Sequence, residues 1–424
     1  MLDINYIREN ADLVKQGMKN KGEKEIGQVD DLLKTDEQWR SLVQKTDELR
    51  SESNTKAKEI GQLMEQGKKE EAQQIIKHTS RLKEQIKELE EDLDQLKEKR
   101  DELLLRIPNV PHESVPVGRT EEDNEVFKTW GEPSEDKWRL PHWQLVEEQG
   151  WIDFERGSKV TGAGFPFYLG PMAKLQRALI NYFLNKATEN DFTEMQAPYF
   201  INEDSARGTG QIPDKEDMMY VIPRDEFFAI PTAEVPVTNF HRDEIIDPEA
   251  LPLYYVAYTP CWRREAGSYG KDVRGLNRLH QFDKVELVKI VHPDTAYDEL
   301  ESLREYAESL LEDLELPYRT LLMCTGDMGF TQTKQYDLEV WSAGQQRWLE
   351  VSSCSNFGGF QARRMQLRFR NDKGNTETLH TLNGSGLALP RVVAAILEEY
   401  QQEDGSIAVP EVLQPFMGME IIEQ

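Results

Sequence analysis

The most regular pattern in the sequence is a repeat of apolar residues across positions 30–107, a stretch rich in Lys, Glu, Gln and Leu. The repeat is clean in its second half, and in its first half polar residues occupy some of the same positions. Two apolar residues per seven place one narrow stripe along a helix, which suits packing against one partner helix. The stripe residues are Leu82, Ile86, Leu89, Leu93, Leu96 and Leu103 in the second half, and Trp39, Leu42, Leu49, Ile60 and Leu63 in the first, with Thr46, Ser53 and Lys56 between them.

A glycine separates the two halves of this pattern. Gly67 lies in the segment MEQGKKEEA and favours a chain reversal, so the two halves predict an antiparallel coiled-coil hairpin. About 35 residues per helix at ~1.5 Å each give a rod of roughly 50 Å. Three prolines in IPNVPHESVPVG then stop the helix and form a stiff connector. We therefore predict an N-terminal helical arm at 1–107 with its coiled coil at 30–107, a linker at 108–118, and a second domain at 119–424.

The second domain has a mixed pattern of strands, helices and turns. Short runs such as YYVAYTPCW and KVELVKIV predict strands, and helical periodicity returns at 174–188, 296–314 and 391–402. The strand runs are separated by long inserts instead of alternating regularly with helices. This arrangement favours an α+β domain built on an antiparallel sheet.

The composition narrows the possible classes of protein. The chain has 424 residues, 51 basic and 78 acidic, for a formal net charge of −27. No run approaches the roughly 18 apolar residues that cross a membrane, and the first residues do not resemble a signal peptide, so we expect a cytoplasmic protein without a membrane partner. The acidic excess is spread along the chain, which predicts a solvated anionic surface, suited to a salty cytoplasm.

The cysteines give no sign of a disulfide framework or a thiolate metal site. Cys261, Cys324 and Cys354 are odd in number, far apart and not part of a C-x-x-C pair. We expect all three to be small buried hydrophobic residues.

The densest group of polar residues is CWRREAGSYGKDVRGLNRLHQFDKVELV, at 261–288. Two strand patterns flank a loop that contains Gly267, Gly270, Lys271 and Arg274. A flexible, cationic hairpin tip within so acidic a chain is suited to binding phosphate, although an ordinary solvated hairpin has the same pattern. The P-loop, G-x-G-x-x-G and H-E-x-x-H motifs are absent from the sequence.

This segment resembles motif 2 of the class II aminoacyl-tRNA synthetases, and R-R-E followed by H-Q-F-x-K-V-E is similar to the bacterial type of the seryl-tRNA synthetase family. Other segments resemble the same family in the same order: a motif 1 helix and strand at 173–198, serine-loop segments GTGQIP and IPTAEVPVTN, a metal and ATP strand in YDLEVW and LEVSSCSNFGGFQARR, and motif 3 in HTLNGSGLALPR, at 380–402. The N-terminal hairpin is similar to that family's tRNA-binding arm. The resemblance covers essentially the whole chain.

The resemblance implies a class II catalytic domain with an antiparallel sheet and an ATP-dependent reaction. L-serine would be activated to seryl-adenylate and transferred to the 3′ end of serine tRNA, with selenocysteine tRNA as a second candidate acceptor. It also implies ATP as a substrate, Mg²⁺ or Mn²⁺ as the metal, and a homodimer. The intact Thr232-Ala233-Glu234 loop implies that no zinc is required.

The resemblance also implies roles for individual residues. Arg263 would bridge the serine carboxylate and the α-phosphate, and Arg391 would hold the γ-phosphate, so these two are the expected catalytic residues. The other expected contacts are Thr232, Ala233, Glu234, Glu286, Asn383 and Ser385 for serine; Arg264, Glu265, Phe282, Glu350, Val351, Ser352 and Ser353 for ATP; Glu350 and Ser353 for the metal; and Lys68, Lys69, Lys77, Arg81, Lys83 and Lys87 for tRNA.

Ser353 is the assignment that fits a regular strand least well. Strand alternation places Glu350 and Ser352 on one face, so Ser353 reaches the same metal only through a twist or a local irregularity. For Glu286 and Phe282, a salt-bridged strand carboxylate and a core aromatic remain the alternatives on sequence pattern alone.

Two other functions remain open at this level. A paralogue that loads serine onto a carrier protein would be expected to lack the arm, which is complete here. A non-catalytic binding protein with this fold would be expected to have lost Arg263, Glu265, Glu350 or Arg391, all of which are present.

Overall fold

The computed structural model describes residues 1–265 and 274–423, in two compact units. One unit contains Leu2–Lys19 and Glu23–Pro108, and the other contains Met1, Asn20–Gly22 and Asn109–Gln424. The border after Pro108 coincides with the start of the predicted linker. Gly267, Gly270 and Lys271 of the predicted phosphate loop lie outside the described residues.

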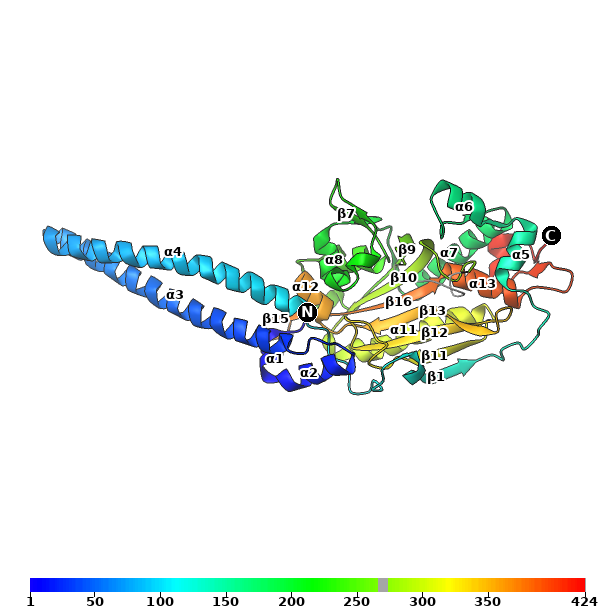
Figure 1. The fold of residues 1–424 in the computed structure, drawn as a ribbon, viewed down its shortest axis with the longest axis horizontal. Helices are drawn as coiled ribbons and strands as arrows, with labels where there is room; N and C mark the ends of the chain where they lie inside the picture. The colour runs from blue at the N-terminus through cyan, green and yellow to red at the C-terminus, as the bar shows by residue number, and fades with distance from the viewer. Residues whose placement is uncertain (266–273, 424) are drawn as a thin grey trace. The chain divides into compact units, whose positions relative to one another are not determined.

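The smaller unit is helical, and its two longest helices form the expected hairpin. Its elements are α1 (Ile4–Glu9), α2 (Ala11–Asn20), α3 (Gln28–Glu65) and α4 (Lys69–Leu105). Figure 1 shows α3 and α4 side by side along their length. The chain reverses at Gly67, whose φ of 78° is readily adopted by glycine. The antiparallel helical hairpin predicted from the sequence is therefore confirmed.

The seam between α3 and α4 follows the predicted stripe, including its polar positions. Thr46 and Ser53 are buried, as is Leu82 on the opposite helix. The Thr46 hydroxyl donates to the carbonyl of Leu42 at 2.8 Å, which satisfies the hydroxyl within its own helix. The polar seam positions therefore leave the helix intact, although they contribute less hydrophobic stabilisation than leucine would.

At the base of the hairpin, a fully buried carboxylate joins three helices. Asp36 of α3 accepts hydrogen bonds from Nε and Nη2 of Arg8 in α1, each at 2.8 Å, and from Nε of Arg40 at 3.0 Å. Arg100 of α4 lies 3.9 Å from the same carboxylate and stacks over Trp39. Burial alone would raise the pKa of Asp36, but the arginine hydrogen bonds outweigh it and hold the pKa below its usual value.

We expect Asp36→Asn to destabilise the helical unit by about 2–3 kcal/mol, because it removes charge-assisted hydrogen bonds at a buried position. Chemical denaturation followed by circular dichroism measures this loss. Asp47→Asn is the matched control, since Asp47 pairs with Arg50 at an exposed position and should change the free energy by less than about 1 kcal/mol. Equal effects from the two variants would contradict a special role for Asp36.

A mixed but mainly antiparallel sheet forms the centre of the larger unit. Among the described residues it has eight strands, in the order β1-β11-β12-β13-β16-β10-β9-β4. All neighbours are antiparallel except β4 and β9 at one edge, which are parallel. The α+β prediction is confirmed. The strands are β1 (Glu125–Trp130), β11 (Tyr318–Leu322), β12 (Lys334–Ser342), β13 (Arg347–Asn356), β16 (His380–Ala388), β10 (Gln281–Val291), β9 (Leu253–Trp262) and β4 (Thr193–Glu194).

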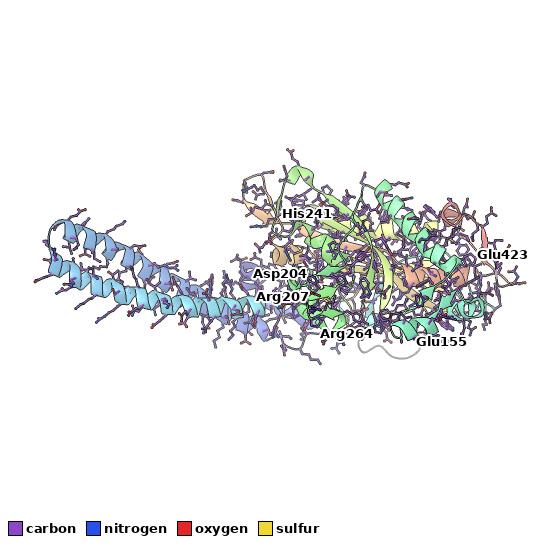
Figure 2. The ribbon with its side chains drawn as sticks, turned by 90° about the horizontal axis from the view of Figure 1, so that it is seen from above. Glu155, Asp204, Arg207, His241, Arg264 and Glu423 are labelled. Atoms are coloured by element: carbon purple, nitrogen blue, oxygen red, sulfur yellow. The ribbon has the colours of Figure 1, made fainter. Side chains whose placement is uncertain are left out.

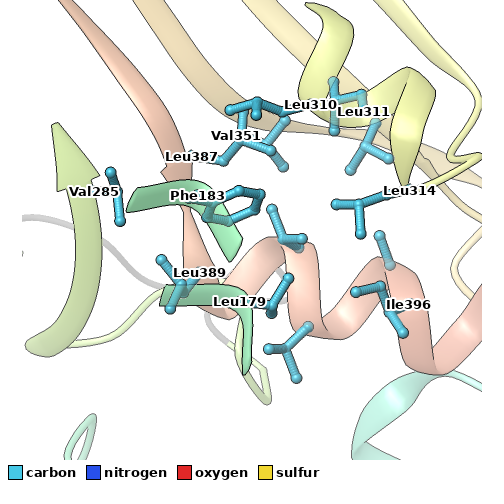
Figure 3. Close-up of a cluster of buried hydrophobic side chains, with 14 of the residues drawn as sticks. Leu179, Phe183, Val285, Leu310, Leu311, Leu314, Val351, Leu387, Leu389 and Ile396 are labelled. Carbon is cyan, nitrogen blue, oxygen red and sulfur yellow. The ribbon is translucent and has the colours of Figure 1, made fainter. Parts of the chain in front are cut away.

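Three helices cover one face of this sheet: α7 (Pro171–Glu189), α11 (Ala296–Asp313) and α13 (Leu389–Glu399). They correspond to the three helical patterns predicted in this part of the sequence. Figure 3 shows Phe183 of α7, Leu311 of α11 and Ile396 of α13 converging with side chains from the strands. This buried layer fixes the sheet, so residues on its opposite face are held on a rigid support.

The remaining elements are short and surround the sheet. They are α5 (His142–Gln149), α6 (Phe154–Val160), α8 (Glu203–Thr209), α9 (Gln211–Asp214), α10 (Glu234–Thr238), α12 (Phe360–Met365), α14 (Gln414–Met417), β2 (Ile152–Asp153), β3 (Phe167–Tyr168), β5 (Phe200–Ile201), β6 (Val221–Ile222), β7 (Phe227–Ala229), β8 (Ile245–Ile246), β14 (Arg368–Arg370), β15 (Thr376–Thr378), β17 (Ile407–Ala408) and β18 (Ile421–Ile422).

The three cysteines are buried and unpaired, as expected. In the described part of the chain, no helix has the length and apolar character needed to span a membrane.

Candidate active site

A cavity of about 1090 Å³ lies in the larger unit, and its walls come from residues that are far apart in the sequence. Strand β10 shows how the sheet builds it. Phe282 and Lys284 line the cavity, whereas Val285 and Leu287, which alternate with them, are in the hydrophobic core. The same cavity is lined by Arg263 at the end of β9 and, from the opposite end of the sequence, by Arg391 at the start of α13.

Most of the predicted site residues come together here. The cavity is lined by Thr232, Glu234, Arg263, Glu265, Phe282, Glu350, Val351, Ser352, Ser353, Asn383, Ser385 and Arg391. Three of the predicted residues are not in this lining. Ala233 is buried in a hydrophobic cluster, Glu286 is fully buried behind the wall, and Arg264 is exposed, at the surface of the unit in Figure 2.

At one end of the cavity, an amide joins two buried carboxylates. The Nδ2 atom of Asn383 donates to Glu286 Oε1 at 2.6 Å and to Glu234 Oε2 at 3.1 Å. Gln361 Nε2 donates to the other Glu234 oxygen at 2.7 Å, and the ammonium of Lys284 forms an ion pair with Glu286. The result is a concentrated negative potential with only one nearby cation, which favours a small cationic ligand.

Burial and the neighbouring charge change the acidity of this end. Burial, together with repulsion from Glu286, raises the pKa of Glu234 to about 6, and the hydrogen bond from Gln361 opposes the shift. A cation bound beside Glu234 would favour its ionised form.

At the other end of the cavity, backbone carbonyls hold the two arginines. Arg263 Nε donates to the carbonyl of Pro231 at 3.3 Å, and its guanidinium lies over the ring of Phe282, 5.1 Å from its centre. Arg391 Nε donates to the carbonyl of Asn277 at 3.0 Å, and its Nη1 donates to the carbonyl of Glu350 at 2.6 Å. Planar guanidiniums oriented in this way suit the binding of carboxylate and phosphate oxygens.

The irregularity that Ser353 requires is present in β13. Leu338 of β12 pairs with Ser352, but the next residue of β12, Glu339, pairs with Glu350, so Val351 is an extra residue in the ladder. This bulge changes the alternation of side chains, and both Glu350 and Ser353 line the cavity. The Ser352 hydroxyl instead donates to the carbonyl of Ser385 at 2.7 Å.

The sequence-based selection missed acidic residues on β12. Asp337 and Glu339 both line the cavity, opposite Ser353 and Glu350 respectively. Burial, reinforced by the charge of Glu350, raises the pKa of Asp337 to about 8, and Gln335 Nε2 donates to its carboxylate at 2.8 Å. Alternation within YDLEVW places both acidic residues on one face and was the available signal.

Comparison with known proteins identifies the family. The family model for the seryl-tRNA synthetase N-terminal domain matches residues 1–111, and that for the class II tRNA synthetase core domain (G, H, P, S and T) matches residues 220–400. The chain is 58% identical to a serine–tRNA ligase of Salinibacter ruber over 420 residues, which are 99% of this chain and 98% of that protein. The chain belongs to the seryl-tRNA synthetase family.

Other members of the seryl-tRNA synthetase family agree over the full length. A serine–tRNA ligase of Bacillus subtilis is 49% identical, over 99% of this chain and 98% of that protein. A solved structure of seryl-tRNA synthetase from Pyrococcus horikoshii complexed with ATP is 37% identical, with a TM-score of 0.94, and the match covers 100% of this chain and 99% of the other. The family resemblance drawn from the motifs is therefore confirmed.

The pKa of Glu234 gives a test that requires no substrate. The folded chain retains a proton on Glu234 between pH 4.5 and about 6, whereas the unfolded chain releases it. Stability from this group is therefore fully present below pH 4.5 and lost as the pH rises through 6. Relative to Glu234→Gln, the wild-type free energy of unfolding should fall by about 2 kcal/mol over this interval.

Denaturant titrations of both proteins across this pH range measure the difference. Glu249→Gln, at an exposed position, is the control and should change stability by no more than about 0.5 kcal/mol. A difference between wild type and Glu234→Gln that is constant or grows with pH would contradict the assignment.

Proposed function

We propose that this chain joins L-serine to ATP as seryl-adenylate and then esterifies the 3′-terminal adenosine of serine tRNA. In the first step a serine carboxylate oxygen bonds to the α-phosphorus, the bond from that phosphorus to the bridging oxygen breaks, and pyrophosphate leaves. The observation that carries the proposal is a single cavity with Arg263 and Arg391 at one end and the pair of carboxylates Glu234 and Glu286 at the other.

The reaction brings two anions together, so the arginines have a direct electrostatic task. Arg263 lies beside Pro231, next to the serine-loop residue Thr232, and can contact both the amino-acid carboxylate and the α-phosphate. Arg391 can bind the terminal phosphates, because carbonyls hold it along the cavity wall. Fixed positive groups at both ends of the triphosphate offset the repulsion and align the attack.

The adenine ring requires a flat apolar surface and a polar partner at its edge. Phe282 supplies the first at the cavity wall, and Glu265 supplies an acceptor for the ring amino group. Arg278 Nε lies 2.9 Å from Glu265 Oε2, which holds the carboxylate in place. Glu265 also has a positive φ of 49°, a strained conformation that fixes where the chain leaves β9.

The oxygen donors on β12 and β13 fit a hard divalent cation. Glu350 and Ser353 would hold Mg²⁺ or Mn²⁺, with Asp337 beside them on the neighbouring strand. Such an ion would neutralise phosphate charge during adenylation. The chain's own part is to orient these ligands, through the bulge at Val351.

Serine recognition follows from the buried carboxylate pair. Glu234, at the cavity wall, suits the α-ammonium, with Thr232 beside it. Glu286, with Asn383 and Ser385, suits the hydroxyl, and an alanine ligand would leave these buried groups without a partner. Each unpaired buried group costs about 1–3 kcal/mol, which is enough to reject alanine.

The helical hairpin is the proposed tRNA-binding arm, and a homodimer is the proposed assembly. Lys68, Lys69, Lys77, Arg81, Lys83 and Lys87 are all exposed, on α4 or at its start. Cations on a helix can bind RNA phosphates by shape and charge without reading bases.

Serine-dependent exchange of pyrophosphate into ATP tests the first step. Wild-type chain should catalyse exchange with serine and not with alanine. Arg263→Lys should reduce the rate by about 10²–10³, because an ammonium cannot reproduce the paired donors of a guanidinium.

Arg264→Lys is the matched control, since this neighbouring arginine is exposed and outside the cavity lining. The proposal fails if the wild-type chain shows no serine-dependent exchange. The assignment of Arg263 fails if both variants retain full activity.

The arm should affect tRNA charging and leave adenylation unchanged. In the triple variant Lys77→Gln, Arg81→Gln, Lys83→Gln, the slope of log affinity for tRNA against log salt should fall by about 2–3, because each lost phosphate contact removes about 0.7–0.9. Lys45→Gln with Lys58→Gln, on the exposed surface of α3, is the control. An unchanged slope, or a matching loss of pyrophosphate exchange, would contradict this assignment.

A further inference from the structure

A second buried polar network lies behind the Arg391 end of the cavity. Its centre is the pair His142, the first residue of α5, and Glu398, near the end of α13, and both side chains are fully buried. His142 Nδ1 lies 2.8 Å from Glu398 Oε1, and the backbone N–H of His142 donates to the same oxygen at 2.9 Å. The sequence analysis selected neither residue.

The Glu398 carboxylate is unusually well supplied with donors. Gln345 Nε2 donates to Oε1 at 3.1 Å, Gly344 N–H donates to Oε2 at 3.0 Å, and the Ser342 hydroxyl also donates to Oε2. Burial alone would raise the pKa of Glu398, but the hydrogen bond from His142 and the other donors outweigh it and keep the pKa below its usual value. The carboxylate is thus held ionised by groups from α5 and from the turn between β12 and β13.

The contacts define the tautomer of His142. Its Nε2 atom accepts the backbone N–H of Leu276 at 2.8 Å, so that nitrogen carries no proton. The ring proton is therefore on Nδ1, where it donates to Glu398. A carboxylate that orients an imidazole in this way fixes the position of the opposite ring nitrogen.

The opposite nitrogen is closely fitted against the segment that returns to β10. Gly275 has a φ of 64°, and a Cβ atom there would lie 2.3 Å from His142 Nε2. Only glycine can occupy this position without displacing the ring. The segment at 274–276 is therefore matched in shape to the imidazole as well as hydrogen-bonded to it.

The next residue connects this network to the cavity. The carbonyl of Asn277 accepts the hydrogen bond from Arg391 Nε, and the Asn277 side chain donates to Gln345 Oε1 at 2.9 Å. Gln345 in turn donates to Glu398. Two routes, one through Leu276 and one through Gln345, thus hold the carbonyl that orients Arg391.

We propose that His142 and Glu398 are positioning residues for ATP, which act by holding the Leu276–Asn277 backbone that orients the Arg391 guanidinium. This inference rests on the proposed function, in which Arg391 binds the terminal phosphates of ATP. It predicts a specific kinetic effect. Loss of the network should weaken ATP binding and leave serine binding intact, because the Glu234–Asn383–Glu286 group makes no printed contact with this network.

Two substitutions separate the two hydrogen bonds of the imidazole. His142→Asn keeps a donor near the Nδ1 position for Glu398 and loses the acceptor for Leu276, whereas His142→Gln can retain that acceptor. In pyrophosphate exchange, His142→Asn should raise the KM for ATP about five- to tenfold, the factor for one lost hydrogen bond. The KM for serine should stay within about twofold, and His142→Gln should lie between His142→Asn and wild type.

Three further proteins make the result decisive. Gln345→Met removes the second route at a half-buried position, so it tests the idea even if the His142 variants fold poorly. Tyr254→Phe removes a 2.6 Å hydrogen bond to Glu299, remote from the cavity, and controls for general loss of stability. Arg391→Lys tests the proposed function itself.

A raised KM for ATP in Arg391→Lys, His142→Asn and Gln345→Met, with Tyr254→Phe unchanged, supports the proposal. If Arg391→Lys raises the KM for ATP but the network variants leave it unchanged, or raise the KM for serine equally, the positioning role is wrong. If Arg391→Lys also leaves the KM for ATP unchanged, the proposed role of Arg391 is wrong, and the positioning role falls with it.

Discussion

The most demanding constraint in this structure is the burial of two carboxylates, Glu234 and Glu286, joined by one amide. Buried negative charge is tolerated only where donors surround it. Asn383 supplies both carboxylates, Lys284 pairs with Glu286, and Gln361 donates to Glu234. These partners come from α10, β10, β16 and α12, so satisfying the charges also fixes four elements around one end of the cavity. A pre-formed anionic end of this kind is rigid before any ligand arrives, which is what specificity for a small polar amino acid requires.

The other end of the cavity follows a different principle. Its charges are guanidiniums held by main-chain carbonyls, and the carbonyls are themselves held by strand irregularity and by buried polar groups. The extra residue Val351 brings Glu350 and Ser353 to the cavity, and the His142–Glu398 pair supports the segment that contacts Arg391. Opposite potentials at the two ends orient an amino acid and a nucleotide toward one another, so catalysis here depends mainly on placement and fixed charge.

The arm and the sheet were predictable because their signals are local and repeated. The stripe through Leu82 and Leu89 reports helix pairing directly, and even its polar members such as Thr46 have the expected burial. The family's motifs led to most cavity residues, including Arg263 and Arg391. His142, Glu398 and Asp337 were missed because their roles come from contacts between distant segments, and a lone histidine or strand aspartate has no local pattern that reveals such contacts. The bulge at Val351 was anticipated only as a requirement, from the spacing of Glu350 and Ser353.

The central claim is that the buried carboxylates hold serine while Arg263 lies at the reacting phosphorus. A crystal structure with a non-hydrolysable seryl-adenylate analogue tests it most directly. The account predicts the serine hydroxyl within hydrogen-bond distance of Glu286 or its partner Asn383, the ammonium beside Glu234, and the group that replaces the α-phosphate in contact with the Arg263 guanidinium. An analogue bound with its serine end away from these carboxylates, or with Arg263 turned out of the cavity, would contradict it.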